Sequence, residues 1–139
     1  MTPKERLAFL ADKLEENANN PKGMKFDLSL WSHTERAVPK AIDCRTTGCA
    51  VGLAGLLPEF VAEGFSITGN IFSTTTPRYV TDRENVEGWR AVETFFDLSP
   101  EKAGWLFTEH RYQWDDLPTK GAAGELAVAN RIREYLEKI

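Results

Sequence analysis

The chain has 139 residues, 27% of them charged, and a formal net charge of −4, which is typical of one folded domain that buries its own core. It carries no basic stripe that would neutralise phosphates, so we expect no duplex nucleic acid as a partner. Without a bilayer-spanning apolar run or an amino-terminal signal, the sequence predicts no membrane partner and a cytoplasmic location.

The first predicted element is a helix that begins at the motif TPKE, residues 2–5. Thr2 is suited to cap it, Pro3 fits the first helical position, and Glu5 stands where a capping-box carboxylate belongs. Apolar residues follow at helical spacing as far as Leu14, and the helix should end within residues 17–21. For residues 24–42 we predict a packed loop or a short turn of helix, because Trp31 interrupts a strand-like alternation.

The most informative segment is DCRTTGCAVGLAGLL, residues 43–57, which carries no charge from Thr46 onwards. A long uncharged run that opens with threonine and is rich in small residues predicts a buried central helix over about 46–57. Gly48, Gly52 and Gly55 leave one side of this helix nearly bare, so another helix or a strand could approach it closely. A short helical turn is predicted next, over residues 59–63.

The second half of the chain has one predicted hairpin and more helices. Residues 65–68 and 78–81 have strand composition, and Gly69-Asn70 suits a tight turn, although residues 71–73 are an alternative partner strand. One helix should follow Asp82 and another the Ser99 cap. A last helix should begin near Thr119, with its inward face formed by Leu126, Ala129, Ile132, Leu136 and Ile139.

The predicted fold is therefore mainly α (α+β), with four to five helices packed around the central helix at about 46–57 and one small β-hairpin. We expect residues 1–139 to form a single α-rich domain.

The chain contains three recognisable stretches before its predicted carboxy-terminal helix: FDLSLW, DCRTTGCAVGLAGLLPEF and FFDLSPEKAGWLF. This arrangement resembles a family of small bacterial and phage proteins of unassigned function. That family carries a D-C-G-T-x-x-C-x-x-G-x-A core and an F/L-G-L-S-x-x-E-A-x-x-L-F segment downstream. The similarity covers residues 24–139 and implies no established activity. The chain has Arg45 and Asp97 where the pattern has glycine, and Arg45 argues against a turn that needs a positive φ angle there.

Cys49 is the strongest candidate for a catalytic residue. If Thr46 caps the central helix, Cys49 lies in its first turn, where free N–H groups and the helix dipole lower a thiol pKa and stabilise an oxyanion. Paired with His110, it would resemble the nucleophile of a papain-like, cysteine-dependent hydrolase or transferase. The alternatives are that Cys49 only packs in the core, as buried cysteines usually do, or forms a disulfide or redox pair with Cys44.

Zinc is a weaker alternative. Cys44, Cys49, His33 and His110 would supply four ligands, but one cysteine pair without a second closely spaced pair is a weak zinc pattern. We expect no metal and no cofactor. The sequence leaves open whether the two cysteines are thiols, a disulfide or metal ligands.

The loop predicted over residues 108–118 mixes aromatic, cationic and anionic side chains, a mixture enriched at protein contacts. Arg111, Tyr112 and Trp114 are therefore candidate binding residues, unless the two aromatic rings fold back over the core. Residues 59–101 hold three basic and eight acidic side chains, and such an acidic stretch could face a basic protein. We predict a small non-enzymatic binding protein with a protein partner, with the Cys49–His110 enzyme as the alternative. The sequence leaves the oligomeric state open.

Overall fold

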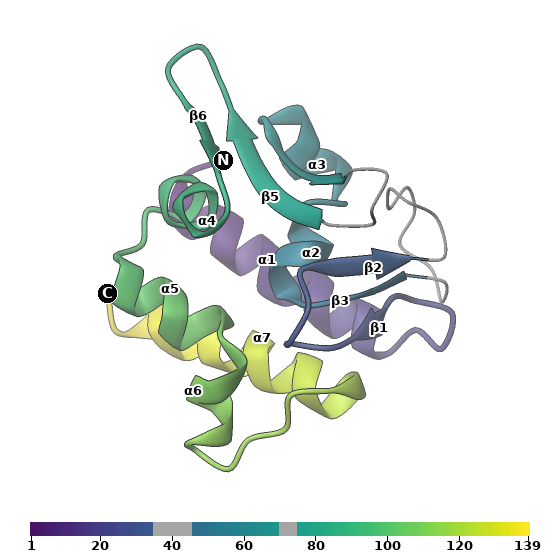
Figure 1. Ribbon diagram of the computed structural model, residues 1–139. Coiled ribbons are helices and arrows are strands. Elements are labelled where there is room, and N and C mark those ends of the chain that lie inside the picture. Colours follow the sequence, from purple (N-terminus) through teal and green to yellow (C-terminus); the bar gives the residue numbers. More distant parts are fainter. Residues whose placement is uncertain (35–45, 70–74) are drawn as a thin grey trace.

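A computed structural model describes residues 1–34, 46–69 and 75–139 (Figure 1). Within these ranges the chain is mixed α+β, with seven helices and two three-stranded sheets. The helices are α1 (Pro3–Ala18), α2 (Ala50–Ala54), α3 (Pro58–Ala62), α4 (Trp89–Phe96), α5 (Pro100–Phe107), α6 (Glu109–Gln113) and α7 (Gly121–Glu137). The strands are β1 (Lys25–Phe26), β2 (Ser32–Thr34), β3 (Thr46–Gly48), β4 (Phe65–Gly69), β5 (Thr75–Val80) and β6 (Asn85–Glu87). None of the helices in the described ranges has the length and apolar character needed to cross a membrane.

The expected count of four to five helices is wrong, and the described residues form two three-stranded sheets where the sequence predicted one hairpin. Three of the seven helices, α2, α3 and α6, are only five residues long. Helices this short complete little more than one turn, so they leave almost no periodic pattern in the sequence. The first sheet, with strand order β1-β3-β2, was not predicted at all.

The caps predicted for two helices are confirmed. Thr2 Oγ1 accepts a hydrogen bond from the Glu5 backbone N–H at 3.2 Å, and Pro3 is the first residue of α1. Ser99 Oγ accepts from the Lys102 N–H at 3.1 Å at the start of α5. These bonds satisfy N–H groups that have no partner within the helix.

The central segment is buried as predicted, but it is not one helix over 46–57. Thr46–Gly48 form β3, which pairs in parallel with β1 and antiparallel with β2. The helix α2 begins only at Ala50, and its cap is Cys49, whose Sγ accepts from the Gly52 N–H at 3.5 Å. The two adjacent β-branched threonines explain the difference, because such residues favour extended backbone.

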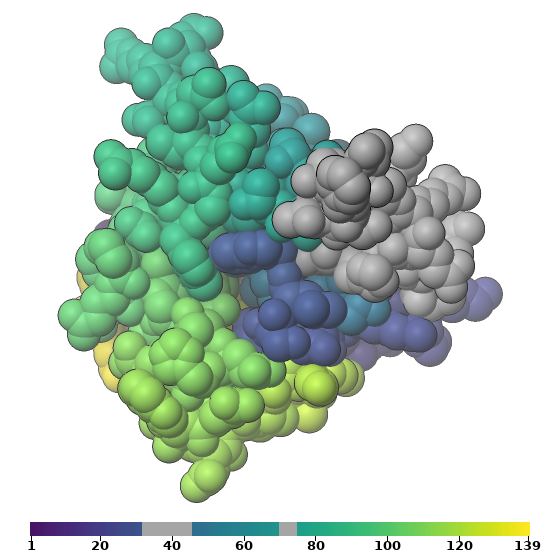
Figure 2. Space-filling model, in the orientation of Figure 1, coloured from purple at the N-terminus to yellow at the C-terminus, as the bar shows by residue number. Residues whose placement is uncertain are grey.

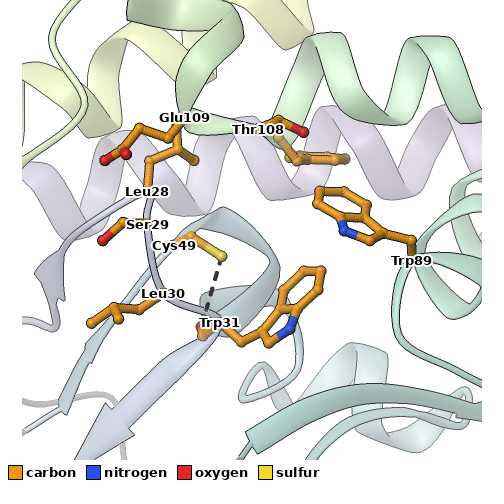
Figure 3. Close-up of a pocket in the computed structure, with 9 residues that line it drawn as sticks. Leu28, Ser29, Leu30, Trp31, Cys49, Trp89, Thr108 and Glu109 are labelled. Atoms are coloured by element: carbon orange, nitrogen blue, oxygen red, sulfur yellow. Dashed lines mark hydrogen bonds between the residues drawn. The ribbon is translucent and has the colours of Figure 1, made fainter.

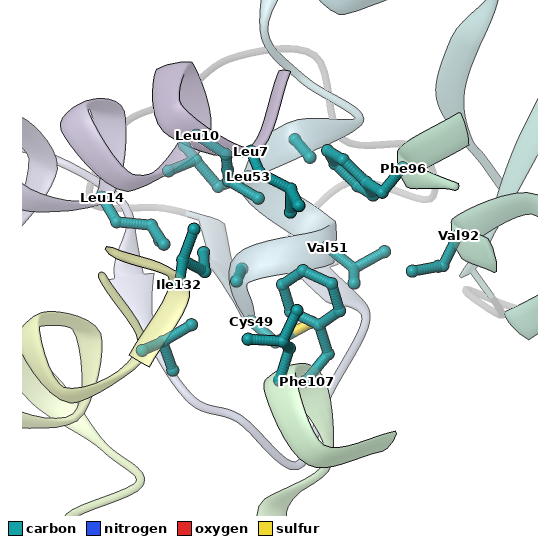
Figure 4. Close-up of a cluster of buried hydrophobic side chains, with 14 of the residues drawn as sticks. Leu7, Leu10, Leu14, Cys49, Val51, Leu53, Val92, Phe96, Phe107 and Ile132 are labelled. Atoms are coloured by element: carbon teal, nitrogen blue, oxygen red, sulfur yellow. The ribbon is translucent and has the colours of Figure 1, made fainter. Parts of the chain in front are cut away.

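All five residues of α2 are buried. Figure 4 shows Leu53 and Val51 among side chains from four other helices. These neighbours are Leu7, Leu10 and Leu14 from α1, Val92 and Phe96 from α4, Phe107 from α5, and Ile132 from α7. The absence of charge in this segment is thus explained, since helices cover α2 and leave no face for a charged group to reach water.

The second sheet contains the predicted hairpin. β4 pairs antiparallel with β5, with Phe65 opposite Tyr79, so the partner strand is residues 75–80. The other candidate, residues 71–73, and the turn residue Asn70 lie outside the described residues. The helix predicted after Asp82 is wrong at its start: residues 85–87 form β6 beside β5, and α4 begins at Trp89 after Gly88, which has φ 65°.

The last helix, α7, lies against α1, and its predicted inward face is confirmed at three positions: Ala129 and Ile132 are fully buried, and Leu136 packs against the core. Ile139 is 52% exposed and Leu126 is half-buried, so the prediction that both face inward is wrong. Glu125 and Arg131, which were not predicted to face inward, are buried as well. Apolar spacing alone could not indicate this, because the two polar residues are buried through partners on other elements.

The first testable consequence concerns Gly55, which ends α2. A Cβ atom on Gly55 would overlap the Ile67 side chain and lie 2.7 Å from the Ile67 backbone nitrogen. The strand β4 thus approaches the helix as closely as the bare glycine surface allows, which is the close approach that the sequence predicted. Because β4 is paired along its length with β5, its backbone cannot shift freely, and Gly55→Ala should lower the free energy of unfolding by about 1–3 kcal/mol.

Urea unfolding followed by circular dichroism measures this, with Gly104→Ala as the matched control. A Cβ on Gly104, inside α5, would meet only Thr108 Oγ1 at an ordinary 3.6 Å. That variant should be neutral or more stable, by up to about 1 kcal/mol from helix propensity. Equal stability of the two variants would contradict the close packing at Gly55.

A second consequence concerns the buried carboxyl of Glu125. It is 1% exposed, and both of its oxygens accept from Asn17 Nδ2, at 3.0 and 2.8 Å. Asn17 is held in turn by two hydrogen bonds with the Met24 backbone. Burial raises the pKa of Glu125 from 4.5 to about 7, against a smaller opposite effect of the Asn17 hydrogen bond.

Because the folded protein holds this proton more tightly than the unfolded chain does, stability should fall as pH rises from about 4.5 to about 7. Glu125→Gln keeps an acceptor for Asn17 but cannot ionise, so it should melt a few degrees higher than wild type at about pH 8 and no higher at about pH 4. Thermal melts of both proteins across this range test it. A melting-temperature difference that does not change with pH would show that Glu125 does not titrate as described.

Candidate functional site

The predicted loop over residues 108–118 contains the helix α6, and its aromatic residues have opposite environments. Tyr112 is fully buried, and its hydroxyl donates to the Leu106 carbonyl at 2.6 Å. Our expectation of a partly exposed Tyr112 at a binding surface is therefore wrong, because its ring completes the core and its hydroxyl is satisfied there. Trp114, in contrast, is 72% exposed.

Arg131 fixes the α6 segment to the helices beside it. Its side chain is 6% exposed, and Nη2 donates to Asp115 Oδ2 at 2.6 Å while Nη1 donates to the Trp105 carbonyl at 3.0 Å. The guanidinium also lies over the rings of Tyr112 and Trp105, at 4.0 and 4.7 Å from their centroids. A buried cation with several partners of this kind holds one geometry, so the end of α6 is rigidly attached to α5 and α7.

The outward side of this anchored segment presents three functional groups. The His110 and Trp114 rings contact each other edge to face, with centroids 5.1 Å apart. Arg111 lies with its guanidinium carbon 5.5 Å from the Trp114 ring centre, and among the described residues it forms no ion pair. Trp114 is thus exposed with Arg111 beside it, and their role in binding stays a prediction.

A pocket of about 330 Å³ adjoins the start of α6 (Figure 3). It is lined by Leu28, Ser29, Leu30, Trp31, Cys49, Trp89, Phe107, Thr108 and Glu109. The indoles of Trp31 and Trp89 form one side, with ring centroids 4.8 Å apart and planes tilted by 57°. On the face shown in Figure 2, the segment around residue 30 (dark blue), the start of α4 (teal) and the α5–α6 region (green) meet.

Cys49 lines this pocket but is only 2% exposed. It is a free thiol. Its backbone N–H donates to the Leu30 carbonyl at 3.0 Å, and its Sγ lies 3.7 Å from the Trp31 carbonyl oxygen. Burial raises the pKa of Cys49 to about 11, although nearby backbone N–H groups act in the opposite direction. The predicted lowering of this pKa at a helix start is therefore wrong, because desolvation dominates over the five-residue helix.

The other predicted ligands and catalytic residues are not gathered around Cys49. His110 is exposed, packs on Trp114, and does not line the pocket that Cys49 lines. Cys44 lies outside the described residues, and for His33 only the backbone, in β2, is described. Among residues 1–34, 46–69 and 75–139, no group of three or more His, Cys, Asp or Glu side chains could hold a metal ion.

Sequence reasoning missed Trp31, Trp89 and Glu109 as neighbours. They come from three elements far apart in the chain, and only the fold brings them to one pocket. The one usable signal was that Trp31 broke the alternation of its segment, which is typical of a side chain placed by tertiary contacts.

No protein-family model, curated protein or solved structure matches this chain. The resemblance to the bacterial and phage family therefore stays a prediction. Position 97, where that family's pattern has glycine, adopts the left-handed conformation, with φ 52° and ψ 58° at the end of α4.

The environment of Cys49 predicts an unreactive thiol. Because it is buried and its pKa is raised, iodoacetamide at about pH 7.5 should modify it at least tenfold more slowly than an ordinary thiol, whose pKa is about 8.5. Mass mapping after timed alkylation of a Cys44→Ser variant measures Cys49 alone. The same variant in denaturant is the control and should react at the ordinary rate. Fast modification in the folded protein at neutral pH would revive the nucleophile hypothesis.

Proposed function

We propose that this protein is a non-enzymatic binding module that recognises another protein through the outward surface of α6. The observation that carries the proposal is Trp114, which is 72% exposed at the end of a helix that is itself firmly anchored. Tryptophan and arginine are the side chains most enriched among the residues that dominate protein interfaces. Trp114 and Arg111 lie side by side on this surface.

The anchoring of α6 strengthens the argument. The bonds of Arg131 to Asp115 and to the Trp105 carbonyl, together with the hydrogen bond of Tyr112, hold the segment before any partner arrives. A surface that is already ordered loses less conformational entropy on binding, so more of the contact energy appears as affinity. A tryptophan that only covered the core would not be turned outward from such a scaffold.

The alternative function, a cysteine-dependent hydrolase or transferase, has less support. It requires a thiolate, an accessible sulfur and a histidine beside it. Cys49 is buried and its pKa is raised, which disfavours both an accessible sulfur and a thiolate. His110 packs on Trp114 and does not lie beside Cys49. We therefore propose no catalytic residue.

The proposal predicts that Trp114→Ala leaves stability nearly unchanged but removes binding. The side chain is mostly in water, so the free energy of unfolding should change by no more than about 0.5 kcal/mol. Loss of an interface anchor of this kind typically costs about 2 kcal/mol or more, which is roughly a thirtyfold weaker Kd. Arg111→Ala should weaken binding in the same direction.

The measurement is affinity capture with quantitative mass spectrometry, followed by the Kd for each purified candidate. Gln113→Ala is the matched control, since Gln113 is also exposed on α6. A true partner is captured equally by wild type and by Gln113→Ala and is lost with Trp114→Ala. If the Trp114 variant keeps every partner, or if it unfolds, the α6 surface is not the contact.

A further inference from the structure

The pocket beside α6 carries a negative charge. Among the residues that the structure describes, Glu109 is the only charged one in its lining, and no Lys or Arg of these ranges contributes to its walls. Within the described part of the chain, the Glu109 carboxylate has no hydrogen bond and no ion pair. Figure 3 shows Glu109 on the side of Leu28 and Ser29, across the pocket from the two indoles. A half-buried carboxylate without a partner favours a cation as its neighbour.

The aromatic side of the pocket favours the same kind of ligand. The faces of Trp31 and Trp89 carry the negative part of the ring quadrupole, and tryptophan is the best aromatic residue for cation–π contacts. No cation among the described residues occupies these rings, since the cation–π contacts in these ranges involve Phe9, Phe95, Trp105, Tyr112 and Trp114.

Asp27 adds negative potential from behind Ser29. The Ser29 hydroxyl donates to Asp27 Oδ1 at 2.6 Å, and the Asp27 charge contributes to the raised pKa of Cys49 in the pocket wall. Among the described residues Lys120 forms an ion pair with Asp27, but its Nζ is 4.0 Å from Asp27 Oδ2 and its side chain is 70% exposed. An ammonium group that is mostly in water and at this distance leaves much of the Asp27 charge unneutralised.

We infer that this pocket receives an arginine side chain of the protein partner, with its guanidinium against the indoles of Trp31 and Trp89 and its charge balanced by Glu109. Arginine fits better than lysine, because a planar guanidinium stacks on aromatic faces and is more weakly hydrated than an ammonium group. The inference rests on the proposed function, since it names what the partner presents. Thr108 and Glu109 line the pocket and also begin α6, so a partner on Trp114 lies close to its opening.

The test uses two blocked tripeptides, one with a central arginine and one with citrulline, its neutral analogue of nearly the same shape. The chain has four tryptophans, whose indole N–H signals can be assigned by Trp→Phe variants and followed by NMR. The arginine peptide should shift the signals of Trp31 and Trp89, leave that of Trp105 in place, and bind more weakly as salt is added. The citrulline peptide should shift none of them at the same concentration.

Two variants then distinguish the pocket from general charge attraction. Glu109→Gln should weaken the arginine peptide by about three- to tenfold, as expected for the loss of a partly desolvated charge partner. Glu101→Gln, an equal charge change at an exposed position outside the pocket, should leave its affinity unchanged.

Equal binding of the citrulline peptide, or equal effects of the two glutamine variants, would overturn the inference. Unmoved Trp31 and Trp89 signals at millimolar peptide would overturn it as well. None of these results bears on partner capture by Trp114, so the inference and the proposed function can fail separately.

Discussion

The structure depends on covering α2 on every side. A five-residue helix is not stable by itself, because the cost of nucleation exceeds the gain from so few hydrogen bonds. It persists here because the uncharged residues Ala50–Ala54 are packed among α1, α4, α5 and α7, with β4 pressed against Gly55. The same packing places Cys49, at the start of α2, in the wall of the pocket beside α6. The candidate site is thus built on the edge of the core.

The sequence predicted the burial of this segment because burial depends on composition, which is a local property. It could not predict where the helix begins, since a buried strand and a buried helix are both uncharged and show no periodicity over so few residues. The caps at Thr2 and Ser99 were predictable for the opposite reason: each is a bond between residues three positions apart, so the motif contains both partners.

In the candidate site, too, features set by residue type could be predicted, and contacts between distant segments could not. Arg111 and Trp114 were identified from residue type alone. The opposite environments of Tyr112 and Trp114 follow from helical geometry, in which residues two positions apart point to different sides, and were missed because the segment was taken for a loop. The pairing of Arg131 with Asp115, and of Trp31 with Trp89, joins separate elements and requires the three-dimensional fold.

The contacts of Arg131 also determine how this part of the molecule can open. Its guanidinium joins α7 to the last turn of α5 and to Asp115 just beyond α6. If any one of these elements moved away, a buried positive charge would lose part of its partners. The α6 segment is therefore not an independent flap but part of a cooperative unit with α5 and α7. The backbone amide of Trp114, which follows α6 directly, would then exchange with solvent deuterium in step with the amides of α7, although it lies near the surface.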